Sequence, residues 1–122
     1  MDFPNLPYFE DNGFKMSETL AIHQYIADKY MPQLLGETPE ERADIDMIAY
    51  IVKEIKMKVT IPCYQLEGTA EDIEGLANLA YEQIERITPR LEKQMYICGT
   101  KICYVDFFLF ETLQMFDFVT KG

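Results

Sequence analysis

The segment from Asp2 to Tyr30 constrains the fold most, because it has the pattern of two short strands, a tight turn and a helix. An apolar run, Leu6–Phe9, leads to Asp11-Asn12-Gly13, where Asn and Gly adopt positive φ at low cost, as hairpin turns require. Phe14-Lys15-Met16 then alternates apolar and polar residues, as a half-buried strand does. The segment therefore predicts a β-hairpin.

A helix is predicted to follow the hairpin. Ser17 is the expected N-cap, because its hydroxyl can accept a hydrogen bond from a free N–H of the first turn. His23 is the only histidine and falls inside this helix, which favours a surface or core role over metal binding or catalysis. The side chains that recur at helical spacing are Ile22, Tyr25, Ile26 and Tyr30.

The rest of the chain is predicted to be helical, after a linker at Met31–Gly36. Thr38-Pro39-Glu40-Glu41 has the pattern of a capping box with proline at the first helical position. Pro62 is expected to end or kink this first long helix. The division predicted is thus a hairpin and one helix in residues 1–31, followed by an all-helical domain in residues 37–122.

Two further long helices are predicted within the second domain. Thr69 with Asp72 predicts the start of one, and Pro89 leaves open either a kink or a new turn beginning at Thr88. Residues 106–119 are dense in Phe and Leu and are expected to be buried on most sides.

Composition excludes several classes of partner. A net charge of −10 argues against nucleic acid and anionic membranes as binding partners. The sequence has no run of about 18 apolar residues, so no membrane-spanning helix is predicted. No signal peptide is visible at the N-terminus. Cys63, Cys98 and Cys103 have no metal-ligand spacing, which favours reduced thiols in a cytoplasmic compartment and no metal site.

Several motifs resemble cytosolic glutathione S-transferases, most closely the mu class. They are Asp2-Phe3-Pro4-Asn5-Leu6-Pro7-Tyr8, Lys15-Met16-Ser17-Glu18-Thr19, Tyr25-Ile26-Ala27, Leu35-Gly36-Glu37-Thr38, Pro62-Cys63-Tyr64 and Tyr104-Val105-Asp106-Phe107. The resemblance covers nearly the whole chain. It implies a mainly α fold, in which a partial thioredoxin-like hairpin and helix precede a helical bundle like the family's C-terminal domain. The family's first strand, helix and second strand, and its last helices, have no counterpart among these residues.

The resemblance implies a glutathione site in the hairpin unit, formed by Asn5, Leu6, Pro7, Glu18 and Thr19. A cis Pro7 would aim the Leu6 backbone at the cysteinyl part of glutathione, and Asn5 would line the peptide. Glu18 and Thr19 would hold the γ-glutamyl group at a helix N-terminus. The alternative is that the proline only shapes the fold and the pair only starts the helix.

The resemblance also implies roles for three residues outside that site. Tyr64 would contact the electrophilic second substrate, or would instead be a core tyrosine with a satisfied hydroxyl. Phe3 would insert into a partner subunit as a dimer contact. Asp106 belongs to a buried capping box that serves folding, and its cap is weakened because Cys103, a poor acceptor, replaces Ser or Thr.

Catalysis in the family uses a tyrosine on the first strand to stabilise the glutathione thiolate, and that strand has no counterpart here. These residues alone are therefore expected to lack transferase activity and to have no catalytic residue. The rival hypotheses are a non-catalytic structural subunit of a larger assembly and a glutathione-binding module without turnover. No cofactor is implied, since glutathione is a substrate in the family.

The strand at Leu6–Phe9 is expected to have an open edge where the family's first strand pairs. Phe9, Phe14 and the apolar face of the 17–30 helix would be left bare. Open edges and apolar patches favour association. We therefore expect a protein partner to cover the edge, in a homodimer or a larger assembly, rather than a free monomer.

Overall fold

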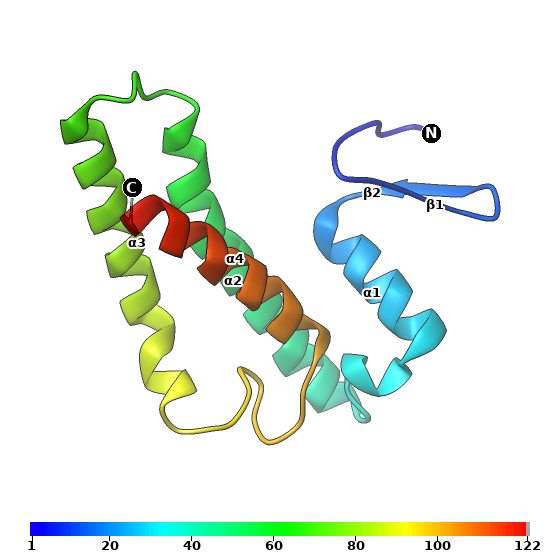
Figure 1. Cartoon of the computed structure of the whole chain (residues 1–122). Coiled ribbons are helices and arrows are strands. Elements are labelled where there is room, and N and C mark those ends of the chain that lie inside the picture. Colours follow the sequence, from blue (N-terminus) through cyan, green and yellow to red (C-terminus); the bar gives the residue numbers. More distant parts are fainter. Residues whose placement is uncertain (122) are drawn as a thin grey trace.

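A computed structural model describes residues 1–121 and has a hairpin and one helix followed by an all-helical part (Figure 1). The mainly α fold class predicted from the sequence is confirmed. The elements are β1 (Tyr8–Asp11), β2 (Phe14–Ser17), α1 (Thr19–Tyr30), the 3-10 helix η1 (Pro32–Leu35), α2 (Pro39–Cys63), α3 (Ala70–Leu91) and α4 (Tyr104–Lys121).

The hairpin is antiparallel, with Tyr8 opposite Ser17 and Asp11 opposite Phe14. Asn12 and Gly13 both have positive φ, as the turn chemistry predicts. The strand expected at Leu6–Phe9 instead spans Tyr8–Asp11. The shift has two causes: Pro7 has no N–H to donate to a ladder, and β2 ends opposite Tyr8, so residues before Tyr8 have no partner.

The prediction that Ser17 caps α1 is wrong. Ser17 is the last residue of β2, and its hydroxyl donates a hydrogen bond to the Phe3 carbonyl at 2.7 Å. Glu18 occupies the cap position instead, with φ 75°, and no side chain caps this first turn within residues 1–121. Because the β1–β2 pairing extends through Ser17, the helix cap falls one residue later than the local sequence pattern suggests.

The hairpin lies on α1 through an aromatic contact centred on Tyr25. The Phe9 and Phe14 rings lie 5.9 and 5.3 Å from the Tyr25 ring, and the Tyr25 hydroxyl donates to Asp11 at 3.0 Å. Phe9 is therefore half-buried, although Phe14 remains exposed. The prediction that both rings and the apolar face of α1 are bare is therefore wrong in part, because Phe9 is half-buried and Ile22 of α1 is buried.

The predicted starts of α2 and α3 are confirmed. Thr38 accepts a hydrogen bond from the Glu41 N–H, whereas the Glu41 carboxylate reaches the N–H of Glu37 rather than that of the cap. Thr69 and Asp72 form a complete capping box. Helix α2 ends at Cys63, directly after Pro62. Helix α3 continues through Pro89 to Leu91, so no new helix begins at Thr88.

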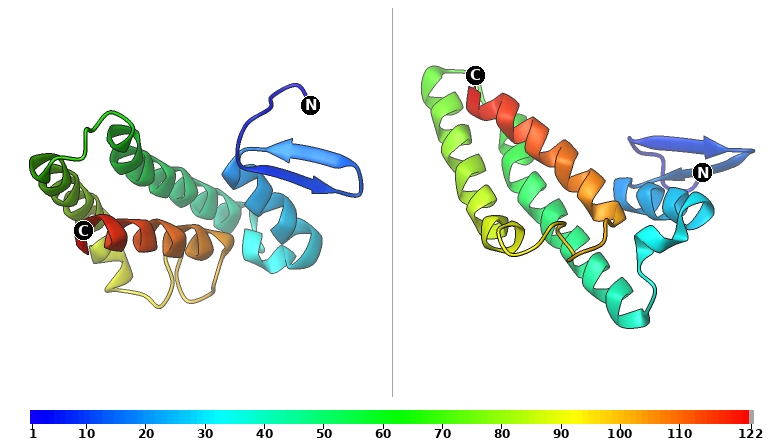
Figure 2. Two further views of the ribbon diagram at one scale, coloured as in Figure 1. Left: turned by 45° about the horizontal axis from the view of Figure 1, so that its top comes forward. Right: turned by 60° about the horizontal axis from the view of Figure 1, so that its bottom comes forward.

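The core lies where α2, α3 and α4 pack side by side (Figure 1, Figure 2). The largest fully buried side chains come from these helices and from the α3–α4 connection, and include Val52, Ile55, Val59, Ile97, Tyr104, Val105 and Phe116. The prediction that residues 106–119 are buried on most sides is wrong. Phe107, Phe110 and Phe118 are exposed, so the helices that contact α4 leave these side chains uncovered.

The hairpin unit meets the helical part where α1 contacts α4. There the His23 ring meets the Phe108 ring edge-on at 5.8 Å. None of the helices within residues 1–121 is both long enough and apolar enough to cross a membrane.

Candidate functional site

The N-terminus of α1 provides backbone donors for an anion. The Ile22 N–H already donates to the Glu18 carbonyl at 3.0 Å, which leaves the earlier N–H groups of the turn outside the helical ladder. The first turn contains no acidic residue, and no side chain in the part of the chain described caps it. Free N–H groups and the positive helix end favour a carboxylate or phosphate at this place.

Two residues predicted to hold glutathione lie at this helix end. Thr19 is the first residue of α1 and is half-buried, whereas Glu18 is exposed. The Glu18 carboxylate lies 3.6 Å from the ammonium of Lys53, which comes from α2. Lys53 is a contact that sequence reasoning missed, because it lies 35 positions from Glu18 in the sequence.

The other three predicted residues lie just before β1. The Leu6–Pro7 peptide bond is cis, as expected from the resemblance. Leu6 is 84% exposed, and its N–H donates to the Asn5 side-chain oxygen at 2.9 Å. A peptide that pairs with the Leu6 N–H would therefore have to replace the Asn5 side chain as its acceptor.

An open cavity of about 500 Å³ lies beside these residues, between β1, α1, α2 and α4. Pro7 and Thr19 line it, but Asn5, Leu6 and Glu18 are not among its lining residues. Its charged wall is an ion pair of Lys56 with Glu111, 2.8 Å apart. Sequence reasoning missed this pair because the two residues come from separate helices, 55 positions apart.

Two titratable side chains of this cavity, Tyr8 and Lys56, are already engaged by carboxylates. The pKa of Tyr8 is raised, mainly because its hydroxyl donates a hydrogen bond to Glu10 at 2.8 Å. Burial lowers the pKa of His23, so its imidazole is neutral near pH 7. Lys56 is held by Glu111. The cavity can therefore bind polar groups, but its hydroxyl and ammonium are engaged, and its imidazole, although neutral, packs edge-on against Phe108.

Tyr64 and Phe3 lie outside this cavity. Tyr64 is the C-cap residue of α2 and is 88% exposed, so the alternative that it is a core tyrosine is wrong. In both Figure 1 and Figure 2 the end of α2 stands apart from the hairpin. Phe3 is 81% exposed on the segment before β1. Within residues 1–121, no cluster of His, Cys, Asp and Glu side chains could hold a metal ion.

Two family models match this chain. Residues 1–28 match the glutathione S-transferase N-terminal domain, and residues 42–122 match the glutathione S-transferase C-terminal domain. The latter match covers more than half of the chain.

Known proteins similar to the chain agree with these matches. The chain is 35% identical over 115 residues to the glutathione S-transferase class-mu 26 kDa isozyme of Schistosoma mansoni, and the match covers 94% of this chain and 51% of that relative. It is 34% identical over 114 residues to glutathione S-transferase Mu 2 of Mus musculus, covering 93% and 51% respectively. The crystal structure of glutathione S-transferase Blo t 8 matches with a TM-score of 0.80 and 26% identity, covering 98% of this chain and 56% of that one. The chain thus spans about half the length of these relatives.

Proposed function

The chain belongs to the glutathione S-transferase family, and we propose that its hairpin and helix α1 form the γ-glutamyl and cysteinyl part of a glutathione site. The resemblance to the mu class is confirmed by relatives at about 35% identity. The observation that carries the proposal is the uncapped N-terminus of α1 beside Thr19. We further propose that residues 1–31 and 37–122 are the two domains, a division supported by the break at η1.

Each proposed residue has a distinct part in binding. The Thr19 hydroxyl and the free N–H groups of α1 would donate to the γ-glutamyl carboxylate. The Glu18 carboxylate would accept from the α-amino group of the ligand, next to its partner Lys53. The Leu6 backbone would pair with the cysteinyl part of glutathione as one strand pairs with another, once the Asn5 side chain has released the Leu6 N–H. The cis Pro7 would fix the path of the backbone at this place.

We propose that these 122 residues bind glutathione without turning it over. Conjugation needs the thiolate, and a positioned donor that stabilises it typically contributes about 10²–10⁴-fold to the rate. Of the groups near the cavity, the Tyr8 hydroxyl is engaged by Glu10, His23 is neutral, and Lys56 is paired with Glu111. Tyr8 and Lys56 are therefore not free to stabilise a thiolate, and a neutral imidazole at His23 brings no positive charge to one.

A conjugation assay with glutathione and a general aromatic electrophile tests this absence of turnover. The 122-residue chain is expected to give the same rate as a heat-treated sample, while a complete mu-class enzyme provides the positive control. A rate clearly above the heat-treated sample would contradict the proposal and would show that another group activates the thiol.

A second candidate function is a non-catalytic structural subunit, favoured by the apolar surface of the hairpin. Phe3, Leu6 and Phe14 are exposed, and β1 pairs only with β2 in the described residues. A homodimer or a larger assembly would cover this edge and these side chains.

Two further proposals concern Tyr64 and the location of the protein. The Tyr64 ring is exposed and remains available to contact a second substrate. The three cysteines are free of disulfide bonds, which supports a cytoplasmic location.

A further inference from the structure

The connection between α3 and α4 is held in one conformation by Asp106. Its two carboxylate oxygens accept hydrogen bonds from the Ile97 N–H at 2.9 Å and from the Cys103 N–H at 2.8 Å. The Ile97 carbonyl in turn accepts from Arg90 at 2.6 Å and from Gln94 at 2.7 Å. Residues 97–103 are therefore fixed at both ends.

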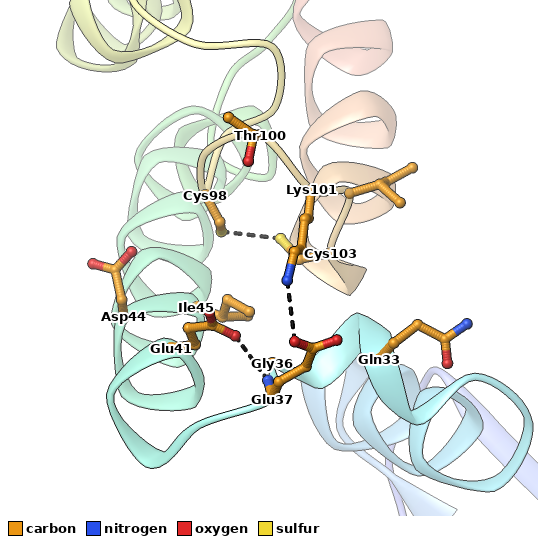
Figure 3. A pocket seen from close by; sticks show the side chains of 11 residues that line it. Gln33, Gly36, Glu37, Glu41, Asp44, Ile45, Cys98, Thr100, Lys101 and Cys103 are labelled. Carbon is orange, nitrogen blue, oxygen red and sulfur yellow. Dashed lines mark hydrogen bonds and ion pairs between the residues drawn. The ribbon is translucent and has the colours of Figure 1, made fainter.

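This conformation brings two cysteines together. The Sγ atoms of Cys98 and Cys103 lie 2.9 Å apart and share a hydrogen bond (Figure 3). That separation is within about 1 Å of the S–S bond length. Cys103 immediately precedes α4, where a Ser or Thr hydroxyl would cap the helix, but its sulfur lies against Cys98 instead.

The two thiols differ in their access to solvent. Cys103 is 2% exposed, whereas Cys98 is half-buried, and both line a pocket of about 140 Å³ between the loop and the start of α2. Lys101 lies across this pocket and pairs with Glu37 at 3.1 Å (Figure 3). A small reagent that enters the pocket would therefore meet the Cys98 sulfur first.

We propose that Cys98 and Cys103 form a thiol–disulfide modification site that reacts with low-molecular-weight disulfides. The Cys98 thiolate attacks one sulfur of the small disulfide, forms a mixed disulfide and releases one small thiolate. The Cys103 sulfur, after losing its proton, attacks Cys98 Sγ and releases the second small thiol. The two cysteine thiols are oxidised to one disulfide, and the small disulfide is reduced to two thiols.

The surroundings of Cys98 and Cys103 set the rates of the two exchange steps. The hydrogen bond with Cys103 and burial raise the pKa of Cys98, and the carboxylates of Asp106 and Asp44 act in the same direction. The Cys98 thiol is therefore protonated at neutral pH, and because the thiolate is the attacking species the first step is slow. The closeness of the two sulfurs makes the second step fast, so the mixed disulfide does not accumulate.

The disulfide would serve the fold at the place where the cap of α4 is weak. It would hold Cys103 to the loop covalently, in addition to the hydrogen bond from its N–H to Asp106. Since the folded chain already places the sulfurs together, folding and oxidation would stabilise each other. This inference does not depend on the proposed glutathione site, because it rests on the α3–α4 connection alone.

The test is oxidation of the folded chain with glutathione disulfide, followed by alkylation in denaturant and digestion with trypsin. Lys101 lies between the two cysteines, so cleavage separates Cys98 and Cys103 into peptides 94–101 and 102–121. We expect these peptides to be recovered joined by a disulfide, with an intact mass lower by two hydrogens. At a fixed ratio of glutathione to its disulfide, the equilibrium constant for this bond should be roughly tenfold or more above that in urea.

Matched variants assign the reaction to the pair. Cys63→Ser should give the same joined peptides, because Cys63 lies at the end of α2. Cys103→Ser should instead accumulate a mixed disulfide of Cys98 with glutathione. Cystamine, which lacks the carboxylates of glutathione, should join the same peptides. The proposal is overturned if the folded chain gives no joined peptide while Cys63 is modified, if urea leaves the equilibrium constant unchanged, or if cystamine fails.

Discussion

The hydroxyl of Tyr104 donates a hydrogen bond to the carboxylate of Asp46 at 2.8 Å, joining the first residue of α4 to α2. The side-chain amide of Gln24, on α1, donates to both groups, at 3.1 Å to Asp46 and 2.9 Å to Tyr104. The three residues thus connect the hairpin unit to the helical part through one polar cluster. Tyr104 is buried, so its hydroxyl has few alternative partners.

Replacing Tyr104 with Phe should therefore lower the free energy of unfolding by about 1–3 kcal/mol, the cost of leaving buried polar groups unpaired. Urea denaturation followed by circular dichroism measures this change. Tyr64→Phe is the control, because Tyr64 is exposed and should tolerate the loss of its hydroxyl. An unchanged urea midpoint for Tyr104→Phe would mean that the cluster does not stabilise the fold.

Replacing Cys103 with Ser should raise the free energy of unfolding by about 0.5–1 kcal/mol under reducing conditions. A serine hydroxyl can accept from the Asp106 N–H, which now donates only to the Cys103 backbone carbonyl at 3.1 Å. Thermal denaturation in a reducing buffer measures the effect. Cys63→Ser, at an exposed thiol, should change stability little. A loss of stability in Cys103→Ser would contradict the view that the cap is weakened by its thiol.

The neutral state of His23 predicts a pH dependence of stability. Burial lowers the pKa of His23 below the ordinary value of 6.5. The unfolded chain therefore binds a proton at a higher pH than the folded chain, and stability falls as pH drops below 6.5 toward the folded pKa. Urea midpoints between about pH 7.5 and pH 5.5 should show this fall, and His23→Asn should reduce it. Equal slopes in both proteins would assign the dependence to other groups.

Phe3 is predicted to contribute to self-association, because it is exposed and burying a Phe side chain contributes about 1.5–3 kcal/mol. Phe3→Ser should shift the sedimentation of the chain toward the monomer. Phe118→Ser, which removes an exposed ring from α4, is the matched control and should sediment like the wild type. An assembly that survives Phe3→Ser would remove this side chain from the interface.

The sequence predicts the order of elements well, because turns and caps are encoded locally. Asn12-Gly13, Thr38 and Thr69 each specify their turn or helix start through their own backbone or side chain. The misplaced cap at Ser17 has a different origin. Its hydroxyl bonds to Phe3, 14 residues away, and no local pattern encodes that contact.

The exposure of side chains is predicted less well, for the same reason. A Phe-rich segment such as 106–119 indicates burial, but how many of its faces are covered depends on which helices pack beside it. The candidate site shows this limit as well. Of the five residues that the family motifs predict for the glutathione site, Pro7 and Thr19 line the cavity and the other three do not. Lys56 and Glu111 reach the cavity only through tertiary packing.

The most direct test of the account is calorimetric titration of the 122-residue chain with glutathione, compared with Thr19→Ala and with Thr120→Ala as the control. We predict weak binding by the wild type and by Thr120→Ala. Thr19→Ala should bind about 10–100-fold more weakly, since a hydrogen bond to a charged group contributes about 1.5–3 kcal/mol. Circular dichroism should show that all three proteins are folded. Equal affinity of the wild type and Thr19→Ala for glutathione would contradict the proposal that the N-terminus of α1 holds the γ-glutamyl carboxylate.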